Sequence, residues 1–127
     1  METCQEQVAR LAKQFQQCQK TLIAIGDPTR QQIVLALLSG GCGGVRVGEV
    51  TAKSHLSRPA VSHHLGVLKD AGLINMRREG TKNYYYFDAN QSLWAEMLEL
   101  FRLANELVQN SSAYRLPADA AEQNRQL

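Results

Sequence analysis

The segment from Leu56 to Ile74 limits the possible folds of this chain more than any other part of the sequence. Ser57 is suited to cap a helix, because its hydroxyl can accept a backbone N–H of the first turn, and Pro59 fits that same turn. Gly72 fits the left-handed backbone that often ends a helix. Apolar and half-polar residues at helical spacing predict a buried stripe between these ends: Val61, His64, Leu65 and Leu68.

The opposite face of this predicted helix is small, polar and basic. It carries Arg58, Ser62, His63, Gly66 and Lys69. A face of this kind can enter the major groove of DNA and reach both base edges and phosphates. The segment therefore predicts a DNA-reading helix, with Ser57 and Pro59 at its leading end.

A hairpin is predicted directly after this helix. Residues 73–79 and 83–88 are rich in aromatic and aliphatic residues, as strands are, and residues 80–82 provide a glycine-containing loop. Arg77, Arg78 and Lys82 suit contacts with phosphates beside the groove. A solvated edge hairpin is the alternative, but a helix-turn-helix followed by a basic hairpin favours a winged helix.

The expected fold is mainly α with one small β-hairpin, a winged helix-turn-helix in a single domain over 1–110 with its core in 21–88. Asp27 and Pro28 predict the start of a helix that ends near Ser39, with Ile33, Val34, Leu37 and Leu38 facing inward. A short helix over 47–53 would be the first of the helix-turn-helix pair. Residues 111–127 form a polar tail that we expect to be disordered.

Two flanking helices are expected over about 4–25 and 92–109. The first carries a heptad-like stripe, namely Cys4, Val8, Leu11, Phe15, Cys18, Leu22 and Ile25, and the second is apolar on more than one face. This is more apolar surface than one small domain hides, so we expect a homodimer through the first and last helices. The alternative is a monomer whose ends close over the core.

Charge is distributed unevenly along the chain. The net charge is only +2, but residues 46–87 hold seven basic and three acidic residues, whereas residues 88–127 hold three basic and six acidic residues. Positive charge thus coincides with the predicted DNA-reading part. The first 25 residues have no apolar core segment, and three cysteines suit a reducing compartment, so the expected location is cytoplasmic, without a membrane span.

Three blocks of the sequence, in this order, resemble the ArsR/SmtB family of bacterial winged-helix repressors. They are residues 21–38, residues 58–74 and residues 78–87. The resemblance implies a homodimer that binds a palindromic operator in double-stranded DNA near its own gene and is released by an inducer. It also implies that Ser57, Arg58, Ser62 and His63 face the DNA, and that Tyr85 and Phe87 point inward from the wing.

The metal-sensing sites of the family do not carry over. Many members have a Cys-x-Cys pair in the helix before the recognition helix, where this chain reads Val47-Gly48-Glu49-Val50. Others have Asp and His ligands on the last helix, where this chain has Glu96, Glu99 and Glu106 but no histidine. Neither standard metal site is therefore expected.

The cysteines are the remaining candidates for sensing. Cys4 and Cys18 lie on the apolar stripe, where free cysteine often behaves as a small buried hydrophobe. Cys42 is surrounded by four glycines, and an accessible thiol can be oxidised or modified. Thiolates also select soft ions, so a soft metal or metalloid is a possible inducer, while structural cysteines are the alternative.

The predicted function is transcriptional regulation by DNA binding, as a repressor. The alternative is a winged-helix module that binds protein without sequence-specific DNA binding. An enzyme is not expected, because the chain shows no paired carboxylates in a pocket-like context, no nucleophile with a plausible base, and no phosphate-cradling loop.

Overall fold

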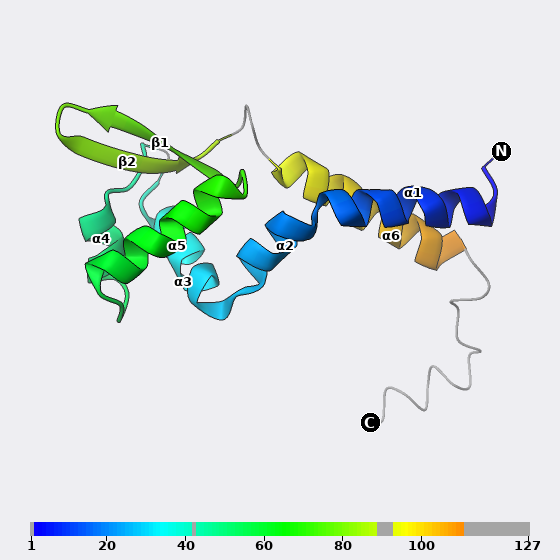
Figure 1. Cartoon of the computed structure of the whole chain (residues 1–127), viewed down its shortest axis with the longest axis horizontal. Coiled ribbons are helices and arrows are strands. Elements are labelled where there is room, and N and C mark those ends of the chain that lie inside the picture. Colours follow the sequence, from blue (N-terminus) through cyan, green and yellow to red (C-terminus); the bar gives the residue numbers. More distant parts are fainter. Residues whose placement is uncertain (1, 42, 89–92, 111–127) are drawn as a thin grey trace, which may run out of the picture.

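The computed structural model describes residues 2–41, 43–88 and 93–110, and these ranges contain six helices and two strands (Figure 1). The expected tail at 111–127, Cys42 and the expected helix start at Ser92 lie outside the described residues. The elements in chain order are α1 (Cys4–Gln17), α2 (Gln19–Gly26), α3 (Pro28–Ser39), α4 (Val47–Ala52), α5 (Arg58–Asp70), β1 (Ile74–Glu79), β2 (Lys82–Phe87) and α6 (Trp94–Asn110).

The elements form two regions. Helices α3, α4 and α5 and the β1–β2 hairpin gather at one end, while α1 and α6 lie side by side and antiparallel at the other (Figure 1). Helix α2 joins them. We call the first region the winged-helix module and the α1–α6 pair the arm. The expected fold of helices with one hairpin is confirmed.

The core of the winged-helix module is fully enclosed by its own chain. Ile33 of α3, Val61, Leu65 and Leu68 of α5, and Leu73 are all inaccessible to solvent. Burial of a side chain of this kind contributes roughly 1.5–3 kcal/mol. The predicted stripe on α5 is therefore the main packing face of the module.

One residue of α3 was predicted wrongly. Ile33 and Leu37 are buried and Val34 is half-buried, but Leu38 is 58% exposed. Ile33 and Leu37 stand four residues apart and share one helix face, whereas the next residue is turned by about 100° away from that face. Asp27 and Pro28 begin the helix as expected, and the Asp27 carboxylate accepts the N–H of Thr29 at 2.8 Å.

The single helix expected over 4–25 is interrupted at Cys18. This residue has φ −95° and ψ 0°, and its N–H is shared between the carbonyls of Gln14 and Phe15. The interruption changes which face is covered. None of the described residues of α1 is buried, whereas Cys18 and, in α2, Thr21 and Ala24 reach the core.

Helix α6 is attached to the end of α5. The Trp94 indole N–H donates to the Leu73 carbonyl at 2.9 Å, and the Leu93 N–H donates to the Gly72 carbonyl at 3.3 Å. The Trp94 ring also meets Phe87 of β2 edge-on, with ring centroids 6.0 Å apart. Gly72 has φ +79°, the left-handed conformation predicted for it.

Candidate DNA-binding surface

Helix α5 has the local structure that its sequence predicts. The Ser57 hydroxyl accepts the Ala60 N–H at 3.3 Å, and Pro59 lies in the first turn, where its missing N–H costs little. Because Val61, Leu65 and Leu68 are buried against the core, the opposite side of α5 must face solvent.

That outer side carries the predicted DNA-binding residues of the helix. Those that are exposed are Ser57, Arg58, Pro59, Ser62, His63 and Lys69, and Gly66 between them is half-buried. No described residue forms an ion pair with Arg58 or Lys69, so both positive charges are available to an anion. His64 is half-buried rather than part of the enclosed core.

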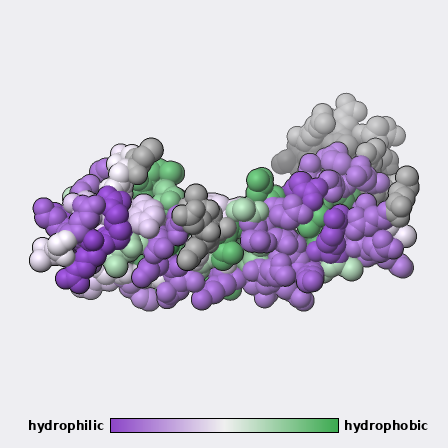
Figure 2. Space-filling model, turned by 90° about the horizontal axis from the view of Figure 1, so that it is seen from above, coloured by the Kyte–Doolittle hydropathy of each residue, from purple (hydrophilic) through white to green (hydrophobic). Residues whose placement is uncertain are grey.

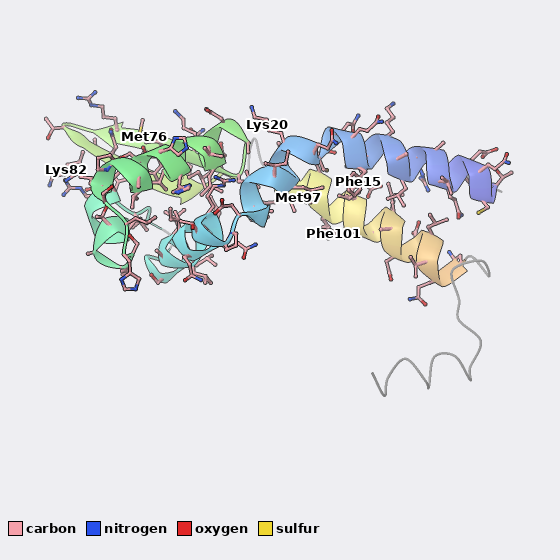
Figure 3. The ribbon with its side chains drawn as sticks, turned by 60° about the horizontal axis from the view of Figure 1, so that its bottom comes forward. Phe15, Lys20, Met76, Lys82, Met97 and Phe101 are labelled. Carbon is pink, nitrogen blue, oxygen red and sulfur yellow. The ribbon has the colours of Figure 1, made fainter. Side chains whose placement is uncertain are left out.

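The wing is a two-stranded antiparallel hairpin. Its register pairs Ile74 with Phe87 at the base and Glu79 with Lys82 at the tip. The turn is therefore Gly80 and Thr81 alone, one residue shorter than expected, and Gly80 has the positive φ (+64°) predicted for it. Figure 3 shows Lys82 at the outer end of the hairpin, far from the arm.

The three basic residues of the wing differ in their contacts. Arg77 donates to the Gly43 carbonyl at 2.6 Å and to Glu79 at 3.0 Å, and its guanidinium lies 5.0 Å from the Tyr84 ring centroid. Arg78 donates to the Gly80 carbonyl at 3.0 Å. Lys82 has no partner among the described residues. Arg77 thus joins the wing to the loop before α4, while Lys82 is free to meet a phosphate.

Aromatic residues alternate along β2 as the resemblance implied. Tyr85 and Phe87 pack against the core, whereas Tyr84 and Tyr86 lie on the face where Arg77 stacks. Tyr85 also pairs with Val45 through two backbone hydrogen bonds of 2.8 Å. This bridge and the Arg77 contact together fix the wing to the segment that leads into α4.

Arg46 is a candidate that residue-by-residue reasoning on the sequence missed. It directly precedes α4 and lines a shallow cleft of about 260 Å³ with Gly48, Glu49 and Arg58. The cleft lies where the first helix of the pair meets the start of α5. The available signal was its position, a basic residue just before the first helix of the pair.

Comparisons with known proteins agree with this geometry. Residues 27–76 match the family described as "Bacterial regulatory protein, arsR family". An uncharacterised HTH-type transcriptional regulator of Methanocaldococcus jannaschii is 32% identical over 95 residues, which cover 75% of this chain and 99% of that protein. The chain belongs to the ArsR family.

Other relatives of this ArsR-family protein support the assignment. The transcriptional repressor SdpR of Bacillus subtilis is 44% identical over 62 residues, which cover 49% of this chain and 66% of that protein. A crystal structure of a possible transcriptional regulator for arsenical resistance is 32% identical, with a TM-score of 0.55 over 72% of this chain and 95% of that one. A predicted DNA-binding transcriptional regulator from E. coli is 29% identical, with a TM-score of 0.56, covering 76% and 96% respectively.

The ArsR-family protein is therefore a DNA-binding transcriptional regulator with a winged helix-turn-helix, as predicted. Its family consists of transcriptional regulators and not of enzymes. Of the described helices, none is long and apolar enough to cross a membrane.

The arm of this ArsR-family regulator exposes apolar side chains. They lie on both helices, and their exposed fractions are 41% for Val8, 51% for Phe15, 70% for Leu98, 55% for Phe101 and 48% for Val108. Figure 2 shows hydrophobic residues at the surface of the arm beside a mainly hydrophilic face, and Figure 3 shows where Phe15 and Phe101 lie on neighbouring helices.

The two described cysteines are in opposite environments. Cys4 is exposed, and Cys18 is 1% exposed, with its Sγ 3.5 Å from the Glu96 carbonyl oxygen. Burial raises the pKa of the Cys18 thiol, and the nearby Glu96 carboxylate raises it further. Since the thiolate is the reactive form, Cys18 is poorly suited to react. Within the ranges 2–41, 43–88 and 93–110, no three potential ligands gather into a metal site.

Proposed function

We propose that this protein is a homodimeric repressor that binds a palindromic operator, with α5 in the major groove and the wing on the flanking phosphates. The observation that carries the proposal is the outer face of α5. Arg58, Ser62 and His63 are exposed there on a helix whose other side is held by a solvent-free core. A rigid helix with a free basic and polar face suits base recognition.

The other DNA-binding residues follow from their places around α5. Ser57 and Pro59 stand at its leading end and Lys69 in its last turn, while Arg78 and Lys82 lie near the tip of the wing. Arg46, beside Arg58, adds a further phosphate contact. Arg77 acts indirectly, because its own contacts hold the wing in place.

The dimer part of the proposal rests on the arm. Exposed residues Phe15, Leu98 and Phe101 would place a large apolar area in water if the chain stayed alone. A second copy that packs against α1 and α6 would cover this area and relate two copies of α5 by a two-fold axis. Such an arrangement matches a palindrome whose half-sites lie about one DNA turn apart.

The proposal includes an inducer that acts on thiols, either by modifying them or, as a soft metalloid, by binding to them. Cys4 supports this part because it is exposed, whereas the buried Cys18 is the least accessible of the described thiols. Release of DNA by arsenite that is abolished by Cys4→Ser, by Cys42→Ser, or by both, is the expected result. DNA binding unaffected by arsenite and by a persulfide donor would count against it.

The experiment that tests the DNA-binding proposal begins with duplexes selected from a random pool by the purified protein. Fluorescence anisotropy then compares the selected duplex with a random duplex for the wild type and for Arg58→Ala. We expect Arg58→Ala to weaken binding to the selected duplex by about 1–3 kcal/mol. Lys13→Ala on α1, which removes the same charge far from α5, is the matched control. Equal affinity of the wild type for both duplexes, or an unchanged preference in Arg58→Ala, would contradict the proposal.

Binding to chromosomal DNA also makes the cytoplasm the proposed location.

A further inference from the structure

Arg30 is a charged residue that the DNA-binding surface does not use, although it lies in the segment that begins α3. Its side chain is only 12% exposed. Buried arginines are normally satisfied by several partners, since each guanidinium has five N–H donors in a fixed planar geometry. The partners of Arg30 therefore indicate what it holds together.

Two of its partners are at the end of α2. The Arg30 Nε donates to the Ala24 carbonyl at 2.6 Å, and Nη2 donates to the Ile23 carbonyl at 3.2 Å. The last four carbonyls of a helix have no partner within the helix, and a positive charge near them is favourable. Arg30 thus caps the C-terminal end of α2. The neighbouring Gln31 also caps this end, because its side-chain amide donates to the Ile25 carbonyl at 2.8 Å.

The third partner is on the recognition helix. Nη1 of Arg30 lies 3.4 Å from Nδ1 of His64, in the middle of α5. Because a guanidinium can only donate, a hydrogen bond at this distance requires Nδ1 of His64 to be the acceptor. The charged and titratable groups near this contact are Arg30 itself, Asp27 with Oδ2 3.8 Å from Nη2, and the exposed His63, whose ring centroid is 5.5 Å from that of His64.

We propose that Arg30 is a positioning residue for DNA recognition, which fixes the recognition helix to the end of α2 through its contact with His64. Arg30 itself is turned away from solvent, so it acts on the DNA through α5 and not by touching a phosphate. The orientation in which α5 presents Arg58, Ser62 and His63 then depends on a hydrogen bond that joins the middle of α5 to the start of α3. This inference rests on the proposed function, because it assumes that α5 reads DNA.

The test compares Arg30→Ala and Arg30→Lys with Gln31→Ala, using the selected and random duplexes. Gln31→Ala is the matched control, because it removes a cap from the same end of α2 without touching α5. We expect Arg30→Ala to lose about tenfold in affinity for the selected duplex, the size of one hydrogen bond to a charged group. Affinity for the random duplex and the salt dependence should change little. If Arg30→Ala does not fold, Arg30→Lys carries the test, since lysine keeps the charge but cannot reach all three partners at once.

Variants of His64 and Arg30 together form a double-mutant cycle that tests the contact between the two residues. His64→Leu should lose selectivity as Arg30→Ala does, and the double variant should lose no more than either alone. His64→Asn, which offers an oxygen close to the position of Nδ1, should retain most of the wild-type selectivity. Additive losses in the double variant would overturn the proposal. So would a loss of affinity for both duplexes with a lower salt slope, which would mean that Arg30 binds phosphate, and so would an equal loss of selectivity in Gln31→Ala.

A measurement on the free protein separates this inference from the proposed function. The ¹⁵N shifts of the His64 imidazole report whether Nδ1 is an unprotonated acceptor, and Arg30→Ala should move the Nδ1 shift. If the wild type shows no preference for any duplex but the shift moves, the proposed function has failed while the Arg30–His64 contact stands. An unchanged Nδ1 chemical shift in Arg30→Ala would show that Arg30 and His64 are not in contact in solution.

Discussion

The winged-helix module and the arm are both built around helices, but the two regions cover their apolar side chains to different degrees. In the module, Val61, Leu65 and Leu68 of α5 are inaccessible to solvent. In the arm, none of the described residues of α1 is buried, and Leu98 on α6 is 70% exposed. The module covers its central apolar side chains within one chain, and Leu35 and Leu38 of α3 are its exposed large apolar residues among those described. The arm buries one side of α6 but keeps an apolar side exposed, and the proposed dimer rests on this exposed side.

The largest expected effect comes from opening the core of the module. Leu65→Ala removes a fully buried side chain and should lower the free energy of unfolding by about 2–5 kcal/mol. Leu98→Ala on the exposed side of α6 should cost much less within one chain. Urea unfolding at one fixed protein concentration measures both. Equal losses would mean that the two regions are equally enclosed in solution.

A charge on the arm should separate the two copies without unfolding either. Phe101→Glu places a carboxylate on a surface that we propose is buried between chains, and desolvation of an unpaired charge is strongly unfavourable. We expect light scattering to report a monomer where the wild type is a dimer, with unchanged helical circular dichroism. A wild type that is already monomeric at micromolar concentration would show that the arm needs no second copy.

The wing offers a smaller contrast, between a free and an engaged basic residue. Lys82→Ala should weaken binding to the selected and the random duplex alike, because Lys82 is expected to contact only phosphate. The slope of log affinity against log salt concentration should become shallower by about 1. Arg77→Ala should instead lower stability by about 0.5–1.5 kcal/mol, since it loses the bonds to Gly43 and Glu79. Salt titrations of binding and urea unfolding distinguish the two. Interchanged results would mean that the roles of the two residues are reversed.

The smallest effect concerns acid stability. The pKa of Asp27 is lowered, mainly because its carboxylate accepts the Arg30 backbone N–H. A group whose folded pKa is depressed stabilises the protein above its unfolded pKa, and this contribution is lost as the pH falls below about 4. Asp27→Asn keeps a capping side chain but cannot titrate. The free energy of unfolding of this variant should therefore fall less steeply between about pH 5 and about pH 3 than that of the wild type. Parallel acid profiles of the two proteins would show that Asp27 does not contribute.

The sequence predicts the module better than the arm for a physical reason. Helix caps such as Ser57 and Asp27, and the spacing of Val61, Leu65 and Leu68, act within a few residues of one another, so they can be read locally. Cys18, where the first helix breaks, instead contacts the carbonyl of Glu96 in α6, a residue 78 positions away. The roles of Arg77 and Arg30 likewise depend on carbonyls and rings from other elements, which no local pattern reveals.

The pairing of α1 with α6 also has a consequence for the order in which the chain acquires its structure. The Gln14 side chain donates to the Glu96 carbonyl, a contact between residues 82 positions apart. At about 5–20 residues per second, ribosomal synthesis would separate the appearance of these two residues by roughly 4–16 s. During that interval α1 has emerged without α6, while the module between them is being made. Helix α1 therefore cannot pack against α6 until Glu96 and its neighbours have been synthesised, so the arm is completed after the module.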